Sequence, residues 1–243
     1  MVQTVDLTKT FDDYQALDNL NLNINKGSIY GLVGVNGSGK TTVIKHLAGV
    51  YQADKGKALI NGVNVYDNPM IKQKIGYVSD DMYFFPQYSM NMLGRFYKNV
   101  YPSFCTKRYN SLISMLNLEP KRSVSRFSKG MQKQAALALT LSIMPEVLLL
   151  DEPIDGLDPI VRKSIFQWII EDVADRKMTV LISSHNLKEM DGICDSVGII
   201  KQGKMLIEQD LDELKAQIAT QLKSEHPTLD EIFIHIYGGA SNE

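Results

Sequence analysis

The segment that most constrains the fold of this chain is residues 34–42, which fits the pattern of a glycine, four further residues and Gly-Lys-Thr. A short apolar run, 28–33, precedes the segment, and residues 43–50 continue with a helical pattern. The glycines therefore fall at a strand-to-helix turn, where backbone N–H groups converge and can hold phosphate oxygens. An ordinary glycine-rich loop would require neither the lysine nor the hydroxyl, so the pattern favours a nucleoside triphosphatase.

The residue types found in this loop can each be explained by the chemistry of phosphate binding. Glycine permits backbone angles and a close approach to phosphate that a Cβ would forbid. Lys40 is predicted to reach the β and γ phosphates, and the Thr41 hydroxyl is predicted to ligate Mg²⁺. The predicted nucleotide-binding residues of the loop are Gly34, Asn36, Gly37, Ser38, Gly39, Lys40, Thr41 and Thr42.

Length, charge and cysteine content limit the classes of protein to which this chain can belong. The 243 residues suit one α/β domain, and a net charge of −2 removes the general electrostatic argument for nucleic-acid binding. Cys105 and Cys194 are the two cysteines and stand far apart, which favours a reduced, cytosolic compartment. The first residues show no signal segment, and no apolar run reaches the length of a membrane span. We therefore expect any membrane role to come through a partner.

Periodicity outlines the architecture. Residues 20–24 alternate apolar and asparagine side chains, as in a half-buried strand, and Asn61-Gly62 indicates a hairpin. The pattern is mainly helical from 82 to 141, whereas 147–150 and 179–182 are apolar runs typical of strands buried on both faces. We expect an α/β fold: a phosphate-loop hydrolase core with a mostly parallel sheet, an N-terminal antiparallel β layer and an inserted α-helical subdomain.

The predicted domain organisation is simple, because the chain shows no repeat and no low-complexity tract. One domain is expected over residues 1–243, with its helical subdomain at about 82–142. A C-terminal extension is expected at about 208–243, in which 210–222 is predicted to be a helix of modest amphipathicity.

Ionisable residues cluster where the two core strands are expected to end. Asp151 and Glu152 come directly after 147–150, and His185 follows soon after 179–182. Parallel strands place their carboxyl ends at one sheet edge, so these groups are expected beside the phosphate loop. One carboxylate can hold Mg²⁺, and the next can polarise the water that attacks a γ phosphate. A lone histidine is usually structural, but this position favours a γ-phosphate sensor.

Over nearly its whole length the chain resembles the ATP-binding-cassette (ABC) ATPases, with the motifs in the same order. The distinguishing motif of that family is Leu-Ser-Gly-Gly-Gln, and Phe-Ser-Lys-Gly-Met stands in its place at 127–131. The resemblance implies that Ser128 and Gly130 touch the γ phosphate of a nucleotide bound to the opposite subunit. Residues 156–158 match the family's D-loop, which places Asp158 at the dimer interface. The implied catalytic unit is a head-to-tail pair with two ATP molecules between the subunits.

Two departures from the family pattern concern the nucleotide site. Asp80 occupies the place where the family usually has a glutamine or glutamate that approaches Mg²⁺ and the attacking water. An aspartate is shorter but can still ligate the ion through water. The adenine-stacking aromatic residue of the family aligns best with Phe11 and less well with Tyr14. Stacking requires only a π face, so phenylalanine is chemically adequate.

Two further segments bear on the partner. Residues 82–88 are unusually aromatic, and in the family this region forms the groove that accepts a short helix of the membrane subunit. Core packing of the helical subdomain is an equally good explanation for any single residue among them. Residues 227–233 resemble the ending of a subfamily that pairs with six-helix export permeases and is linked to drug, antibiotic, lipid, polysaccharide or peptide export.

The resemblance therefore implies the ATP-binding and ATP-hydrolysing subunit of a membrane exporter, peripheral on the cytoplasmic face of the cell membrane. Its cofactors would be ATP and Mg²⁺. Its partners would be a membrane-spanning permease and a second ABC ATPase subunit, identical or different, with no nucleic acid expected. The implied catalytic residues are Lys40, Asp80, Glu152 and His185, and the implied metal ligands are Thr41, Asp80 and Asp151.

Two rival classes of function stay open at this point. A soluble ABC ATPase that acts on ribosomes or DNA usually joins two cassettes in one chain or inserts a long coiled coil, and this chain shows neither. A catalytically silent regulatory module would not need Lys40, Glu152 and His185 together. The transported substrate is not readable from this chain.

Overall fold

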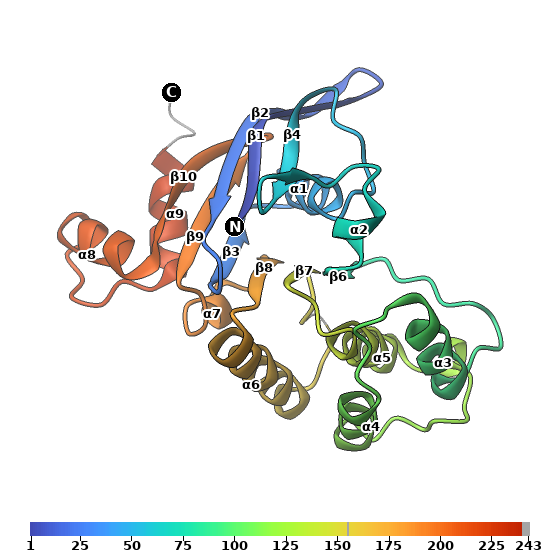
Figure 1. The fold of residues 1–243 in the computed structure, drawn as a ribbon. Coiled ribbons are helices and arrows are strands. Elements are labelled where there is room, and N and C mark those ends of the chain that lie inside the picture. The colour runs from blue at the N-terminus through green and yellow to red at the C-terminus, as the bar shows by residue number, and fades with distance from the viewer. Residues whose placement is uncertain (155, 240–243) are drawn as a thin grey trace.

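Two β-sheets organise the chain, which the computed structural model describes over residues 1–154 and 156–239 (Figure 1). The larger sheet has the strand order β10-β9-β3-β8-β7-β6, in which β10 runs antiparallel to β9 and every other neighbouring pair is parallel. Its strands are β3 (Ile29–Val33), β6 (Ile75–Val78), β7 (Val147–Asp151), β8 (Thr179–Ser184), β9 (Ser196–Lys201) and β10 (Lys204–Asp210). The mostly parallel core sheet expected from the sequence is thus confirmed.

The centre of this sheet is buried on both faces. Every residue of β7 and β8 is buried. Leu148 and Val180 belong to the core cluster on one face, whereas Leu149 and Leu181 belong to the cluster on the other. Because side chains of a strand alternate between the two faces, a strand covered on both sides needs the continuous apolar run seen in the sequence.

The smaller sheet is antiparallel and has the order β2-β1-β4-β5. Its strands are β1 (Val2–Phe11), β2 (Tyr14–Ile24), β4 (Lys55–Ile60) and β5 (Val63–Asn64). The alternating segment of β2 turns Leu20, Leu22 and Ile24 inward, where each is at most 2% exposed. These side chains share a core cluster with Ile44 of the following helix and with Leu149 of the larger sheet. The predicted N-terminal antiparallel layer and the Asn61-Gly62 hairpin are therefore both present.

Helix α1 (Lys40–Leu47) begins three residues earlier than the pattern at 43–50 predicted. Gly39 precedes it with φ 112°, a backbone angle that favours glycine, so the helix starts directly at the lysine. At the other end Gly49 has φ 67°, and its N–H donates to the His46 carbonyl. A left-handed glycine ends helices in this way, which is why the helix stops before Val50.

Three helices between β6 and β7 lie together on one side of the molecule, away from the antiparallel sheet (Figure 1). They are α3 (Met90–Val100), α4 (Thr106–Met115) and α5 (Lys129–Ser142), with a 3₁₀ turn at Val124–Arg126. The remaining helices are α2 (Pro69–Lys72), α6 (Pro159–Arg176), α7 (Leu187–Met190), α8 (Leu211–Leu222) and α9 (Leu229–Gly239). Helix α8 begins as the sequence predicted, because Asp210 caps it by accepting from the backbone N–H groups of Asp212 and Glu213.

Among the described residues, no helix is both long and apolar enough to cross a membrane. Residues 240–243 of the expected C-terminal extension lie outside the described part of the chain.

A charged cluster joins the helical region to the core. Asp172 of α6 is 4% exposed, and its carboxylate accepts hydrogen bonds from Arg108 of α4 at 2.5 Å and from Arg176 at 2.9 and 3.1 Å. The Arg108 guanidinium also lies 5.1 Å from the centre of the Trp168 ring. Trp168 therefore adds a cation–π contact across the same junction.

Replacing Asp172 with alanine is expected to lower the free energy of unfolding by about 2 to 3 kcal/mol, because two guanidinium groups lose their buried partner. Denaturant unfolding would measure the change. Asp175→Ala on the exposed face of the same helix is the matched control, with an expected effect within about 0.5 kcal/mol. Equal stability of the two variants would show that Asp172 does not hold the junction together.

Candidate active site

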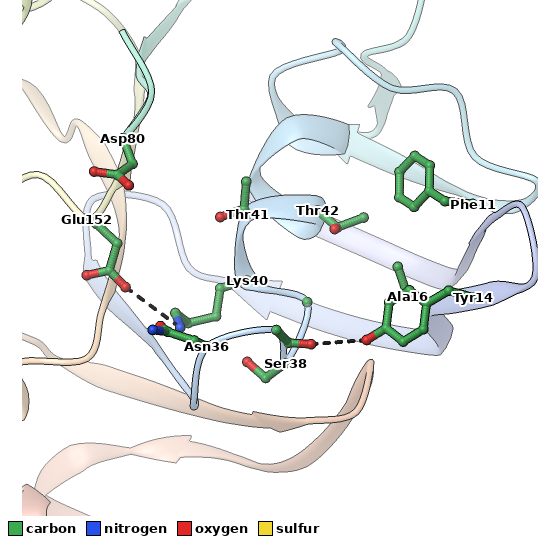
Figure 2. Close-up of a pocket in the computed structure, with 12 residues that line it drawn as sticks. Phe11, Tyr14, Ala16, Asn36, Ser38, Lys40, Thr41, Thr42, Asp80 and Glu152 are labelled. Carbon is green, nitrogen blue, oxygen red and sulfur yellow. Dashed lines mark hydrogen bonds and ion pairs between the residues drawn. The ribbon is translucent and has the colours of Figure 1, made fainter.

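A cleft of about 590 Å³ lies at the N-terminus of α1 and is shared by both sheets (Figure 2). It brings most of the predicted nucleotide-site residues together, although they come from four separate parts of the sequence. The residues that line it are Phe11, Tyr14, Ala16, Asn36, Gly37, Ser38, Gly39, Lys40, Thr41, Thr42, Asp80 and Glu152.

The loop at 34–39 is packed too tightly to accept side chains at two of its glycines. A Cβ on Gly34 would lie 2.5 Å from the Ser38 hydroxyl oxygen and 2.6 Å from the Ile200 carbonyl oxygen. A Cβ on Gly39 would lie 3.0 Å from the Ala16 carbonyl oxygen, at a positive φ that already favours glycine. The loop is therefore held against β2 and β9, with the first amides of α1 directed toward the cleft.

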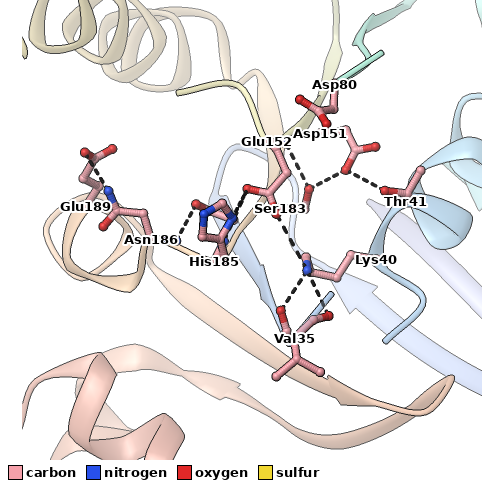
Figure 3. Close-up of polar contacts among 12 residues, drawn as sticks. Val35, Lys40, Thr41, Asp80, Asp151, Glu152, Ser183, His185, Asn186 and Glu189 are labelled. Atoms are coloured by element: carbon pink, nitrogen blue, oxygen red, sulfur yellow. Dashed lines mark hydrogen bonds and ion pairs between the residues drawn. The ribbon is translucent and has the colours of Figure 1, made fainter. Parts of the chain in front are cut away.

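Lys40 is buried, yet its ammonium reaches the floor of the cleft. The Nζ atom donates to the carbonyl oxygens of Gly34 at 2.7 Å and Val35 at 3.3 Å, and lies 3.7 Å from Glu152 Oε1 (Figures 2 and 3). The side chain is 7% exposed, so little water screens its charge. A fixed positive charge beside converging backbone N–H groups is suited to bind phosphate.

Oxygen atoms of three elements meet beside Thr41. Its hydroxyl donates to Asp151 Oδ1 at 3.1 Å, and the Ser183 hydroxyl donates to the same oxygen at 2.7 Å (Figure 3). The other carboxylate oxygen, Asp151 Oδ2, is buried and has no hydrogen-bond partner within the described chain. A buried, unpaired carboxylate oxygen beside a hydroxyl fits a hard cation such as Mg²⁺, which binds through few protein oxygens together with phosphate oxygens and water.

No cluster of three or more histidine, cysteine or acidic side chains with metal-binding geometry occurs within residues 1–154 and 156–239. This result is compatible with a Mg²⁺ site built on Thr41 and Asp151, because such a site depends on the phosphates of the nucleotide for most of its ligands.

Glu152 and His185 contact each other at the ends of β7 and β8. Glu152 Oε2 lies 3.0 Å from His185 Nδ1 and 3.3 Å from the His185 backbone nitrogen, which donates to it. The Glu152 side chain is 12% exposed, whereas that of His185 is 56% exposed. The carboxylate therefore points between Lys40 and the imidazole, at the same sheet edge that the sequence predicted (Figure 3).

The backbone of Glu152 is unusual, with φ at 48°. This left-handed conformation is unfavourable for a residue with a Cβ, so contacts with its surroundings must stabilise it. Its N–H donates to both the carbonyl and the hydroxyl oxygen of Ser183, each at 3.2 Å. Its carbonyl oxygen accepts a hydrogen bond from Lys133 Nζ at 2.6 Å.

Asp80 lies beyond the end of β6, on the wall of the cleft near Glu152 (Figure 2). Its carboxylate is 60% exposed and accepts from Lys133 Nζ at 3.3 Å. The sequence therefore predicted its place beside the carboxylates but not its lysine partner.

Phe11 and Tyr14 stand at the outer end of the cleft, where β1 turns into β2 (Figure 2). Phe11 is 36% exposed and rests edge-on against Tyr51, with ring centres 5.3 Å apart. The Tyr14 hydroxyl donates to the Gly37 carbonyl oxygen at 3.1 Å. Phe11 is thus available for stacking, and Tyr14 ties the hairpin to the phosphate loop.

Ser128, Gly130 and Asp158 do not line this cleft. The Ser128 hydroxyl caps α5 by accepting from the Met131 backbone N–H at 3.3 Å, and Asp158 caps α6 in the same way. A Cβ on Gly130 would lie 2.5 Å from the Gly156 carbonyl oxygen, so the two predicted interface segments are packed together. Both helix N-termini and their capping residues therefore stand apart from the nucleotide site of their own chain.

The aromatic segment at 82–88 divides into two groups. Met82, Phe84 and Tyr88 are partly buried against the core of the helical region. Tyr83 and Phe85 are 80% and 50% exposed and contact each other edge-on. Core packing thus explains one group and leaves the other on the surface.

The other histidines have structural contacts or lie away from the cleft. His46 is 2% exposed, its Nδ1 pairs with the Thr42 carbonyl oxygen at 2.7 Å, and burial lowers the pKa of its imidazole. His235 pairs with Gln221 on the helices after β10, and His226 lies in the turn between them.

Sequence reasoning missed two contributors to this site. Ser183, two residues before His185, was not among the predicted site residues, although its place opposite Asp151 in the parallel register was a usable signal. Lys133 had no signal, because a lysine in a helical stretch normally predicts a solvent-exposed face.

Comparison with known proteins agrees with this geometry. Residues 17–155, more than half of the chain, match the family model described as ABC transporter. The chain is 34% identical to the ABC transporter ATP-binding protein YtrB of Bacillus subtilis (strain 168), over 89% of this chain and 74% of that protein. It is 36% identical to the bacitracin transport ATP-binding protein BcrA of Bacillus licheniformis, over 88% of this chain and 71% of that protein.

Solved structures agree on the fold. The structure of an ATP-binding subunit of an ABC transporter matches with a TM-score of 0.87 and 23% identity, over 98% of this chain and 99% of that one. The dimeric structure of MJ0796, a bacterial ABC transporter cassette, matches with a TM-score of 0.79 and 23% identity, over 87% and 99%. The chain belongs to the ABC transporter family and is an ATP-binding, ATP-hydrolysing cassette.

Ser183→Ala is expected to lower the rate of ATP hydrolysis about tenfold and to raise the Mg²⁺ concentration needed for half-maximal rate, because Asp151 and the Glu152 backbone each lose a hydrogen bond. Steady-state hydrolysis measured across a Mg²⁺ titration would test this. Ser142→Ala is the control, since Ser142 is equally buried but donates to the Ala138 carbonyl oxygen within α5. The same Mg²⁺ dependence in both variants and the unmodified chain would contradict the role of Ser183.

Proposed function

We propose that this chain is the ATPase subunit of a membrane exporter, bound to the cytoplasmic face of the cell membrane through a permease and active as a head-to-tail dimer. In this proposal residues 1–243 form one cassette. Its helical subdomain spans about residues 82–142, and its C-terminal extension about 208–243, of which 240–243 lie outside the described residues.

The observation that carries the proposal is the convergence of five side chains at one sheet edge. Lys40 and Thr41 begin the helix that follows β3. Asp151 is the last residue of β7 and Glu152 comes next, and His185 follows β8 (Figure 3). Lys40 lies 3.7 Å from Glu152, and Glu152 lies 3.0 Å from His185. A cation for phosphate, oxygen ligands for a metal and an acid–base pair are the groups that hydrolysis of a γ phosphate needs.

Each of these side chains has a proposed task. Lys40 and the amides of residues 36–42 bind the triphosphate, and Thr41 and Asp151 would hold Mg²⁺. The ion would neutralise charge on the β and γ phosphate oxygens. Glu152 accepts a proton from the attacking water or positions that water, and His185 donates a hydrogen bond to the γ phosphate.

Two further residues complete the site within one chain. Phe11 presents the face of its ring to the adenine, a contact that is supported by its exposure at the outer end of the cleft. Asp80 would help to hold Mg²⁺ and the attacking water, which is supported by its place on the cleft wall and its exposed carboxylate.

The dimer is proposed because Ser128, Gly130 and Asp158 do not line the nucleotide cleft of their own chain. In a head-to-tail pair, the N-terminus of α5 and the Ser128 hydroxyl would face the γ phosphate held by the partner. Asp158 would then lie across the interface. A cassette of this fold is known as a dimer, which supports the arrangement.

The permease is proposed to dock near the exposed aromatic side chains after β6. Phe96 of α3 joins Tyr83 and Phe85 on this surface, since it is 44% exposed and its ring centre lies 6.4 Å from that of Phe85. Met92, one turn earlier in the same helix, is 46% exposed. Aromatic and methionine side chains are enriched in the cores of protein interfaces. Because BcrA is named for bacitracin transport, we propose a drug, an antimicrobial peptide or a lipid-like molecule as the exported substrate.

Isolation from native membranes in mild detergent tests the export role. The expected result is stoichiometric copurification of a multi-helix membrane protein, and Tyr83→Ala and Phe85→Ala would weaken that association. Recovery only in the soluble fraction, together with ribosomes or nucleic acid, would overturn the export role and leave the ATPase chemistry intact.

Glu152→Gln is expected to keep ATP binding and to lower turnover by about 100-fold or more, because the amide cannot accept the proton of the attacking water. The variant should also accumulate as an ATP-bound dimer, which size-exclusion chromatography with ATP would detect. Glu171→Gln, on the exposed face of α6, serves as the control. Turnover at the unmodified rate would remove Glu152 from its proposed role.

A further inference from the structure

A buried lysine outside the known motifs connects two acidic positions of the active site. Lys133 lies in the second turn of α5 and is 5% exposed. Its Nζ atom donates to the Glu152 carbonyl oxygen at 2.6 Å and to Asp80 Oδ1 at 3.3 Å. The same ammonium group thus joins the helical region to the end of β7 and to the segment that follows β6.

The hydrogen bond from Lys133 stabilises the backbone conformation that orients the Glu152 carboxylate. Glu152 has φ at 48°, an unfavourable angle for a residue with a side chain. Ser183 holds the N–H side of this residue, and Lys133 holds its carbonyl side. Together they direct the carboxylate toward Lys40 and His185.

The ion pair with Asp80 links this clamp, the hydrogen bonds of Ser183 and Lys133 to the Glu152 backbone, to events at the protein surface. A buried ammonium requires a compensating negative charge, and the Asp80 carboxylate supplies one at 3.3 Å. The Asp80 side chain is 60% exposed, whereas that of Lys133 is 6% exposed. A displacement of Asp80 would therefore weaken the electrostatic support of a group that itself fixes the Glu152 carbonyl.

We propose that Lys133 is a positioning residue that couples the placement of Asp80 to the geometry of Glu152. The proposal rests on the proposed function, in which Glu152 acts on the attacking water and the permease docks at the residues that follow Asp80. A partner bound there would alter hydrolysis by moving Asp80, with Lys133 as the physical link. ATP binding would be little affected, because Lys133 does not line the cleft around the phosphate loop.

The side chain of methionine matches the stem of lysine without its charge, so Lys133→Met in the full chain is the first test. We expect kcat to fall about tenfold and KM for ATP to change by less than about twofold, because the lost hydrogen bond supports Glu152 rather than the nucleotide. Lys133→Arg keeps the charge and the donors and should recover most of the rate. Lys107→Met, on the exposed face of α4, is the control for removing a lysine from the helical region.

A purely structural role predicts a different pattern. In that case Lys133→Met would lower the unfolding temperature, reduce the amount of folded protein and leave kcat per folded molecule unchanged. Thermal unfolding of each variant, together with active-site titration by a fluorescent ATP analogue, separates the two cases. An unchanged kcat per binding-competent molecule overturns the proposal.

The link to Asp80 has its own test. If Lys133 transmits part of the effect of Asp80, the loss of kcat in the double variant Asp80→Asn/Lys133→Met should be smaller than the product of the two single losses, because both changes break one pathway. Losses that multiply would show that Asp80 and Lys133 act independently, and would overturn the coupling.

Hydrogen exchange gives a readout that does not need turnover. Exchange in the peptide that covers 147–154 should accelerate in Lys133→Met and stay slow in Lys107→Met. Equal protection in both variants would overturn the proposal even if the chain hydrolyses ATP. Absence of hydrolysis in the unmodified chain, with the exchange difference present, would instead count against the proposed function and support the clamp.

Discussion

The active site depends on the parallel pairing of β3, β8 and β7. Parallel strands end at a common edge, so residues that are more than a hundred positions apart in the chain become neighbours there. The register sets Asp151 opposite Ser183, and the same edge holds the loop that leads into α1. A shift of one residue in this register would turn Asp151 to the other face of the sheet and remove it from Thr41.

Local patterns were sufficient to predict the layers of this fold. The alternation in 20–24 identified a strand with one buried face, and the continuous apolar runs at 147–150 and 179–182 identified strands covered on both sides. The phosphate-loop pattern located the start of α1 only approximately, because helical periodicity is invisible at the glycines and at Lys40. The structure resolved that boundary through the backbone angles at Gly39 and Gly49.

Side chains at strand ends were also predictable, since parallel strands place their carboxyl ends at one edge of the sheet. Contacts that depend on tertiary packing were not. Lys133 lies in a helix where sequence alone suggests exposure, and its burial follows from how α5 docks beside Glu152. The partner of Asp80 was missed for the same reason. Ser183 occupies an intermediate case, because its role follows from the strand register once Asp151 has been placed.

The close packing of Gly130 against Gly156 changes what a genetic experiment at this position can reveal. Any side chain at 130 would meet a backbone carbonyl at 2.5 Å, and backbone cannot rotate away as a side chain could. An inactive variant at Gly130 would therefore report a displaced loop within its own subunit as well as any lost contact with a neighbour. Mixed dimers that combine one altered subunit with one intact subunit could distinguish the two defects by which of the two nucleotide sites fails.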